Sequence, residues 1–408
     1  MAINIIYDDN EIQVIHRLGD PGSTLLAFSA ILYRPNEPDY WASSPADKYD
    51  LNCISFSPKS KNYFPMDSML KAKPAIDRCL SGIIVGYGSS MGAYAALKYS
   101  SLFKSSVTLA FSPQISVSPS DVPFDEVRHC YYSEIKNGDM LVKGRDLNGA
   151  VCVFFDPKHP IDAAHIELLK KNADGHSVTT VPVPYGGHDI INLVADARLF
   201  SKLYECCLLN DIGPFKRLMK SATRKSDTYR LNLGRYCIRH GKKKISSAVF
   251  QSLDKELVPE FLSASVQAVE YFNSGHPEDA RVYAEVFLRN ISACYDYGAA
   301  STVGWVYSQL GSYYEALLCY RKAIEIEPNV ISSHFGYIDT LSAMGLFVEA
   351  SSAASKALAI FDDAELYGKL GWAALAGGDK GLALESFKRG LLLNPSIAHL
   401  SEGMSASL

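Results

Sequence analysis

Residues 83–97 read Ile83-Ile84-Val85-Gly86-Tyr87-Gly88-Ser89-Ser90-Met91-Gly92-Ala93-Tyr94-Ala95-Ala96-Leu97. The stretch begins with β-branched residues typical of a buried strand and ends with residues that favour a helix. Between them Gly88, Ser90 and Gly92 form a GxSxG pattern, whose small flanking residues permit a sharp strand-to-helix turn. The stretch therefore predicts a nucleophilic Ser90 on an elbow; the alternative is a turn that only packs a helix against a strand.

The residues around this elbow alternate strand and helix patterns. Eight runs rich in β-branched and aromatic residues are expected as strands, and four segments with apolar residues at three- and four-residue spacing as helices. The first two strands have no helix between them, which predicts an antiparallel hairpin at the sheet edge. Residues 113–149 lack a clear period and predict a small cap or a long loop. The expected strands are 3–7, 12–16, 24–32, 52–57, 82–87, 106–112, 150–155 and 178–184, and the expected helices 66–79, 91–101, 162–172 and 189–208.

A serine hydroxyl needs a base, and His188 is the best-placed histidine. It follows the eighth expected strand, whereas His159 and His165 lie near the seventh. An acid is expected after that seventh strand, where Asp156 and Asp162 compete. Asp156 stands at the strand end and is favoured as the group that orients His188, because Asp162 precedes a helical stretch and could be an N-cap.

An oxyanion hole needs two backbone N–H donors. We expect one from Met91, directly after the nucleophile, and one from the loop after the third strand, at Ser29 or Ala30. The histidine-glycine pair that often supplies the second donor from such a loop is absent from this sequence.

With these residues in register, residues 1 to about 210 resemble the α/β-hydrolase family. The resemblance implies a mostly parallel eight-stranded sheet with helices on both faces, and acyl transfer through a covalent acyl-enzyme. More narrowly, Phe155-Asp156-Pro157 and Asp162-Ala163-Ala164-His165 resemble serine hydrolases of bacterial surface-polysaccharide synthesis or accessory secretion, including glycan O-acetyltransferases.

The second half of the chain contains repeats. Small and aromatic residues recur at about 34-residue spacing, and a weaker unit is expected at 261–296 around Ala280 and Ala284. The repeating positions are Gly304, Tyr307, Gly311, Ala316, Tyr320, Ala323 and Pro328, then Gly345, Ala350 and Ala357, then Gly371, Ala374, Gly378, Ala383, Phe387, Gly390 and Pro395. With these positions, this part resembles the tetratricopeptide repeat family, which implies a concave surface that holds a protein segment.

A basic stretch separates these parts. Residues 214–244 hold eleven basic residues and one acid, Asp227, a local charge of +10 in a chain of net −4. We expect a solvated helix paired with the acidic remainder; the alternative is contact of residues 216–244 with an anionic glycan or a membrane surface. The basic residues are Lys216, Arg217, Lys220, Arg224, Lys225, Arg230, Arg235, Arg239, Lys242, Lys243 and Lys244.

The composition sets outer limits. The 408 residues are 48% apolar and 21% charged, typical of a globular protein with two domains, and the net charge argues against nucleic-acid binding. The start lacks a leader pattern, and the nine cysteines form no CxxC pair. We expect a cytoplasmic protein with reduced thiols, no disulfides, no metal and no cofactor.

Three regions are predicted: an α/β-hydrolase domain at 1–212, a basic helical linker at 213–260 and a helical repeat domain at 261–408. The leading hypothesis is a serine esterase, deacetylase or O-acyltransferase that acts on a small acyl group, with an ester or acyl donor as substrate and a glycan as one acceptor class. Its repeats would bind a protein partner. The alternatives are a non-catalytic interaction scaffold and a thioesterase.

Overall fold

The computed structural model describes residues 3–30, 40–194 and 197–408, and the chain divides into two compact units, Met1–Asn232 and Leu233–Leu408. The division falls inside helix α8 (Asp227–Arg239). The stretch expected as a linker, residues 213–260, is therefore shared between the two units.

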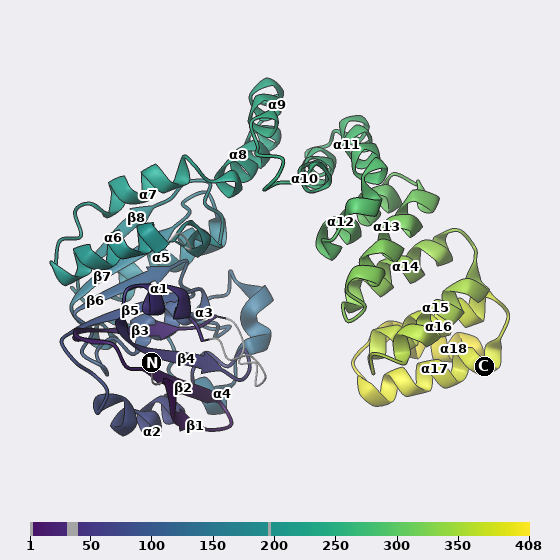
Figure 1. Cartoon of the computed structure of the whole chain (residues 1–408). Helices are drawn as coiled ribbons and strands as arrows, with labels where there is room; N and C mark the ends of the chain where they lie inside the picture. Colours follow the sequence, from purple (N-terminus) through teal and green to yellow (C-terminus); the bar gives the residue numbers. More distant parts are fainter. Residues whose placement is uncertain (1–2, 31–39, 195–196) are drawn as a thin grey trace. The chain divides into compact units, whose positions relative to one another are not determined.

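The first unit contains an eight-stranded, mostly parallel sheet (Figure 1). The strands lie in the order β1-β2-β4-β3-β5-β6-β7-β8; β2 is antiparallel to β1 and β4, and the pairs from β4 to β8 are parallel. All eight expected strands are present, and the edge hairpin is confirmed. The expected extension of the third strand to residues 31–32 lies outside the described residues. The strands are β1 (Ile3–Asp8), β2 (Ile12–Arg17), β3 (Asp20–Phe28), β4 (Leu51–Pro58), β5 (Ile83–Ser89), β6 (Val107–Phe111), β7 (Ala150–Phe155) and β8 (Val178–Pro182).

Helices cover both faces of this sheet. Along β3, Leu26 and Phe28 join the apolar core under α2, α3 and α5, whereas Leu25 and Ala27 join the core under α1, α6 and α7. The alternation follows from the two-residue period of a strand, and both sets are apolar because a parallel sheet is buried on both faces. The helices are α1 (Ser43–Lys48), α2 (Met66–Asp77), α3 (Met91–Lys98), α4 (Glu134–Asn137), α5 (Pro160–Asn172), α6 (Ala197–Leu208) and α7 (Phe215–Thr223).

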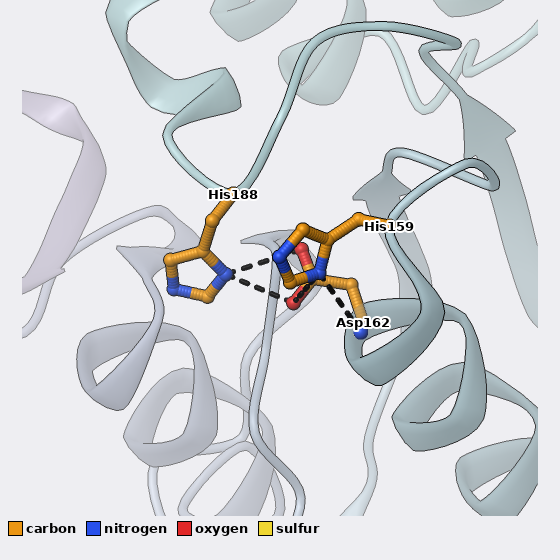
Figure 2. A group of neighbouring side chains, drawn as sticks. All are labelled: His159, Asp162 and His188. Carbon is orange, nitrogen blue, oxygen red and sulfur yellow. Dashed lines mark hydrogen bonds and ion pairs between the residues drawn. The ribbon is translucent and has the colours of Figure 1, made fainter. Parts of the chain in front are cut away.

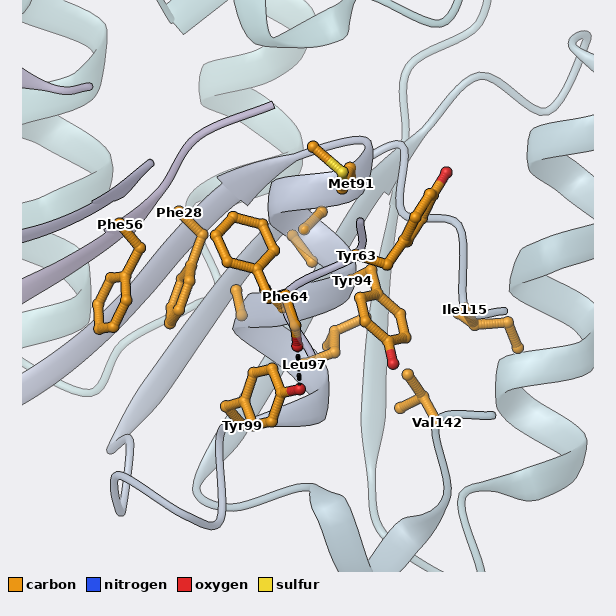
Figure 3. Close-up of a cluster of buried hydrophobic side chains, with 14 of the residues drawn as sticks. Phe28, Phe56, Tyr63, Phe64, Met91, Tyr94, Leu97, Tyr99, Ile115 and Val142 are labelled. Carbon is orange, nitrogen blue, oxygen red and sulfur yellow. Dashed lines mark hydrogen bonds between the residues drawn. The ribbon is translucent and has the colours of Figure 1, made fainter. Parts of the chain in front are cut away.

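Aromatic side chains dominate the core under α3 (Figure 3). Phe28 and Phe56 stack with ring centroids 4.3 Å apart, and the Tyr99 hydroxyl donates a hydrogen bond to the Phe64 carbonyl. The segment 113–149 joins this core at both ends through buried residues such as Ile115 and Val142. It is an ordered excursion with short helices: α4 and the 3-10 turns Glu126–Tyr131 and Gly144–Asp146.

The second unit is built of antiparallel helix pairs. A glycine with positive φ stands between the helices of five successive pairs, where a left-handed residue ends a helix at the least steric cost. The expected weak unit at 261–296 is one of these pairs. The glycines are Gly241, Gly275, Gly311, Gly345 and Gly378. The helices after α8 are α9 (Lys243–Gln251), α10 (Glu260–Asn273), α11 (Pro277–Arg289), α12 (Tyr297–Gln309), α13 (Tyr313–Ile326), α14 (Ile331–Ala343), α15 (Phe347–Leu358), α16 (Ala364–Ala376), α17 (Lys380–Leu393) and α18 (Ala398–Ser407).

The repeating small residues allow these helices to pack closely. A Cβ on Gly304 would lie 3.2 Å from the ring of Tyr320, and one on Gly371 would lie 2.6 Å from the ring of Phe387. The expected pairing of the basic stretch with acidic residues is present within this unit. Both Nε and Nη2 of Arg239 donate to the buried carboxylate of Glu270, at 2.6 and 2.7 Å.

Among the described residues, no helix is both long enough and apolar enough to cross a bilayer.

The close approach of α3 to the sheet gives a stability prediction. A Cβ on Gly92 would lie 2.0 Å from the carbonyl oxygen of Phe28, which is backbone and cannot swing away. We expect Gly92→Ala to lower the free energy of unfolding by roughly 1–3 kcal/mol, because overpacking forces backbone shifts. Urea unfolding measures this. Gly22→Ala is the control, because its Cβ would meet only the Asp20 side chain at 3.4 Å; equal stability of both variants would contradict the packing.

Candidate active site

Ser90 lies in a strained turn between β5 and α3. Its backbone has φ 54° and ψ −119°, a conformation that non-glycine residues rarely adopt. The turn is held on both sides: the Ser90 N–H donates to the carbonyl of Phe111 at 2.8 Å, and the Ser90 carbonyl accepts the first helical bond from the Tyr94 N–H. A Cβ on Gly88 would lie 2.4 Å from the backbone of Gly92, so the turn also requires glycine there.

The structure places His188 beside Ser90. His188 lies in the loop after β8, and its Nε2 is 3.0 Å from the Ser90 Oγ. The imidazole is partly exposed, with 23% of its side chain accessible. The residue expected as a base is therefore within hydrogen-bond distance of the residue expected as a nucleophile.

The acid that contacts His188 is Asp162, and the preference for Asp156 was wrong. The Nδ1 of His188 lies 2.9 and 3.1 Å from the two carboxylate oxygens of Asp162. The alternative prediction, that Asp162 is an N-cap, was also wrong. Asp162 lies in the first turn of α5, and the side chain that caps this helix is His159.

Asp156 faces backbone amides instead of the imidazole. Its carboxylate accepts hydrogen bonds from the N–H groups of Tyr185, Gly187 and Lys158, at 2.8–3.0 Å. With these bonds the strand-end carboxylate fixes the loop that carries His188, so that Asp156 positions the histidine through the backbone.

Asp162 is almost fully buried, yet it is ionised at neutral pH. Burial raises the pKa of its carboxyl, but hydrogen bonds and charge from His159 and His188 lower it more, and the pKa is about 2. A buried anion next to Nδ1 keeps the hydrogen of His188 on that nitrogen, which leaves Nε2 free to accept a proton.

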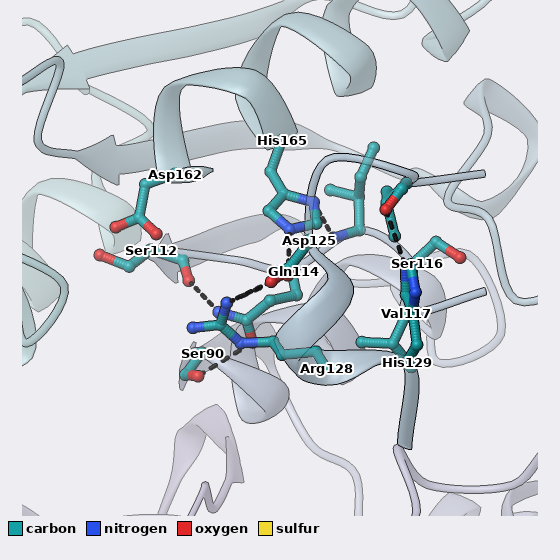
Figure 4. Close-up of polar contacts among 12 residues, drawn as sticks. Ser90, Ser112, Gln114, Ser116, Val117, Asp125, Arg128, His129, Asp162 and His165 are labelled. Atoms are coloured by element: carbon teal, nitrogen blue, oxygen red, sulfur yellow. Dashed lines mark hydrogen bonds and ion pairs between the residues drawn. The ribbon is translucent and has the colours of Figure 1, made fainter. Parts of the chain in front are cut away.

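The two other nearby histidines have different surroundings. His159 also turns its Nδ1 toward Asp162, at 3.1 Å (Figure 2). His165 is fully buried and pairs with Asp125 through Nε2 at 3.0 Å (Figure 4). His165 therefore belongs to a separate network, whereas His159 contacts the same carboxylate as His188.

Gln114, which follows β6, was missed in the sequence. Its side chain is fully buried, and Oε1 accepts a hydrogen bond from the Ser90 hydroxyl at 2.9 Å (Figure 4). Its Nε2 lies 3.2 Å from the His188 Nε2. The Ser90 hydroxyl thus has two acceptors within 3.0 Å, the glutamine and the imidazole. No local pattern marks Gln114, because its role depends only on where the chain leaves β6.

The expected oxyanion donors differ in whether their N–H groups already have a backbone partner. Met91 is the first residue of α3, so its N–H has no partner within the helix. The Ser29 N–H donates to the Phe56 carbonyl at 2.9 Å. The prediction that this N–H donates to the oxyanion was therefore wrong. Ala30 remains a candidate, and residues 31–39 lie outside the described residues.

One group of side chains at this site has the composition of a metal site. Among the described residues, His159, Asp162 and His188 bring one ligand atom each within 4.8 Å of one another.

Comparisons with known proteins identify the repeats. The family model of the tetratricopeptide repeat matches residues 299–330 and 364–397, so the C-terminal part of the chain contains tetratricopeptide repeats. A search of curated proteins finds no match.

Several solved structures align with the helical part. MamA AMB-1 is 19% identical with a TM-score of 0.33, over 42% of this chain and 93% of that one. MamA from Desulfovibrio magneticus RS-1 is 18% identical with a TM-score of 0.32, over 36% and 84%. The first repeat domain of Spaghetti, bound to an HSP90 peptide, is 21% identical with a TM-score of 0.26, over 27% and 89%. The family-model match, and not these alignments, identifies the repeats.

The hydrogen bonds of Asp156 give a second prediction. Asparagine has one acceptor oxygen instead of two, so Asp156→Asn would leave at least one N–H of the His188 loop unpaired. We expect a loss of roughly 1–3 kcal/mol in the free energy of unfolding, measured by urea titration. Unchanged stability would contradict the assignment of Asp156 as the anchor of this loop.

Proposed function

We propose that the first unit is an α/β-hydrolase that acts as a serine esterase, deacetylase or O-acyltransferase on a small acyl group, with an acetyl ester of a glycan as one candidate substrate class. The observation that carries the proposal is the continuous chain of contacts from Asp162 through His188 to the Ser90 Oγ. Each member is a residue type with a defined role in acyl transfer.

The architecture supports the same proposal. Ser90 follows the central strand β5, and the imidazole follows the last strand, as in the chain order serine, acid, histidine of α/β-hydrolases. The strand order, with its antiparallel β2 and its parallel remainder, suits that fold. Substrate does not follow from fold, so the glycan class rests on the resemblance of residues 155–165.

The distances support the following mechanism. Ser90 Oγ attacks the ester carbonyl while His188 Nε2 takes its proton, which forms a tetrahedral oxyanion near the Met91 N–H. Collapse of that intermediate expels the alcohol, which receives the proton from His188 and leaves an acyl group on Ser90. Water, or a sugar hydroxyl, then attacks the acyl-enzyme with His188 again as base. Asp162 stays ionised throughout and stabilises the imidazolium.

The hydrogen bond from Ser90 to Gln114 competes with this first step. To be activated, the hydroxyl must turn from the Gln114 Oε1 to the His188 Nε2, which are 2.9 and 3.0 Å from it. The rotation breaks one hydrogen bond and forms another of similar length, so its cost is small beside the barrier of acyl transfer.

The tetratricopeptide repeats favour a partner-binding role for the second unit. Stacked repeats create a concave surface that suits an extended or helical protein segment. A second candidate function, a scaffold whose first unit does no chemistry, is favoured by this match alone. The basic stretch gives less support to a glycan or membrane contact, because several of its residues are paired with Asp227, Glu270 and Asp279.

A fluorophosphonate probe tests the enzymatic proposal. An activated serine attacks the phosphorus of the probe and displaces fluoride to form a phosphonate ester, so we expect stoichiometric labelling of the wild-type protein and none of Ser90→Ala, measured by intact mass. Denatured wild-type protein is the control for nonspecific labelling. If the wild type is not labelled, or if Ser90→Ala is labelled equally, the scaffold hypothesis is favoured instead.

The choice of acid gives a kinetic prediction. Asp162→Asn keeps the side-chain shape but removes the charge that holds the hydrogen on His188 Nδ1, so kcat/KM for a short-chain ester should fall by roughly 10³–10⁴. Asp189→Asn is the matched control, because this exposed neighbour of His188 is also an aspartate. Equal rates for Asp162→Asn and the control would exclude Asp162 as the acid.

A further inference from the structure

Two imidazoles converge on one buried carboxylate at this site. The Nδ1 atoms of His159 and His188 both turn toward Asp162, at 3.1 and 2.9 Å from its Oδ1 (Figure 2). The two rings are 5.8 Å apart between centroids. A catalytic triad needs only one of these histidines, so the second transfers no proton in the proposed mechanism.

The Nδ1 of His159 faces both a backbone donor and an anionic acceptor. Its Nδ1 accepts the backbone N–H of Asp162 at 3.3 Å, for which it needs a lone pair, and the same atom lies 3.1 Å from an anionic oxygen of that residue. A ring nitrogen carries either a lone pair or a hydrogen, not both. When Nδ1 accepts the cap hydrogen bond, its lone pair faces the carboxylate, and either a hydrogen on Nδ1 or a metal ion at that place removes the repulsion.

The donor set matches a specific class of cation. Two imidazole nitrogens and one carboxylate oxygen are ligands typical of zinc, which binds such atoms at about 2.0–2.2 Å and so needs them roughly 3.3 Å apart. The histidine nitrogens already lie close to this spacing from Asp162, and all three ligand atoms are within 4.8 Å. We propose that His159, Asp162 and His188 form a binding site for zinc or a similar divalent ion.

The surroundings suit entry and retention of such an ion. Asp162 has 1% of its side chain exposed, whereas His159 and His188 have 33% and 23%. The ion can approach from the histidine side and bind the buried anion. The other nitrogen of His188 is in contact with the buried Gln114 side chain, a contact that remains in Ser90→Ala and is the kind of support that strengthens metal sites.

Metal binding would switch off the enzyme, a consequence that rests on the proposed function. The ion takes the lone pair of His188 Nδ1, so a hydrogen that the neutral ring retains must be on Nε2. Nε2 is then a donor and cannot accept the proton of Ser90. The ion also separates Asp162 from His188. The proposed site therefore makes this hydrolase subject to reversible inhibition by zinc.

Binding is measured first, independently of activity. Zinc is titrated by calorimetry into wild-type protein, Ser90→Ala, His159→Asn and His240→Gln. Asparagine at 159 preserves an N-cap acceptor for α5 while it removes the imidazole, and His240 is an exposed histidine of the second unit that serves as control. Thermal unfolding confirms that each variant is folded. Cobalt, added instead of zinc, reports on the ligands through its absorption spectrum.

We expect one strong site in the wild type, Ser90→Ala and His240→Gln, and at least tenfold weaker binding in His159→Asn. Zinc should inhibit ester hydrolysis by the wild type, with recovery on adding a chelator, and His159→Asn should need at least tenfold more zinc for half-inhibition. Equal affinity of His159→Asn and the wild type would overturn the site, as would a cobalt spectrum with a sulfur-to-metal band. Zinc binding by a wild-type protein that shows no esterase activity would support the site while refuting the proposed function.

Discussion

The hydrogen bond between His188 and Asp162 joins two segments that are far apart in the chain. One comes from the loop after β8 and the other from the first turn of α5. Because α5 follows β7, the bond connects the segments at the carboxyl ends of the neighbouring parallel strands β7 and β8. Ser90 follows β5 and lies at the same end of the sheet. Both groups are held by backbone contacts, Asp162 by its position in the helix and His188 by the loop that Asp156 anchors. The alignment of the imidazole with Ser90 depends on all of these contacts.

Much of this arrangement could be predicted from local sequence. Residues 83–97 specify a buried strand, a turn and a helix by composition alone, and the small residues at Gly88 and Gly92 are required by distances that no side chain could satisfy. His188 was identifiable because it follows the last strand and precedes a helical segment. The eight strands were found because their β-branched and aromatic runs are separated by clear breaks.

The remaining parts depend on tertiary geometry. Asp156 and Asp162 both follow β7, and only the path of the chain between them decides which carboxylate meets the imidazole and which meets backbone amides. The sequence places Ser29 where an oxyanion donor is expected, but only the tertiary structure shows that its N–H is paired with the Phe56 carbonyl. The sequence did not clearly predict the helix pairs that turn at Gly241 and Gly275. The residues around these two glycines lack most of the small-residue pattern of the later repeats.

The central claim is that an acyl group passes through the Ser90 hydroxyl. Rapid quenching during turnover of an activated acetyl ester, followed by trypsin digestion and mass spectrometry, tests it directly. The tryptic peptide from Cys79 to Lys98 contains Ser90. Fragmentation of this peptide distinguishes an acetyl group on Ser90 from one on Ser89. We predict a transient acetyl group on Ser90 that disappears when the ester is exhausted. Acetyl groups confined to lysines, or equally abundant in Ser90→Ala, would contradict the account.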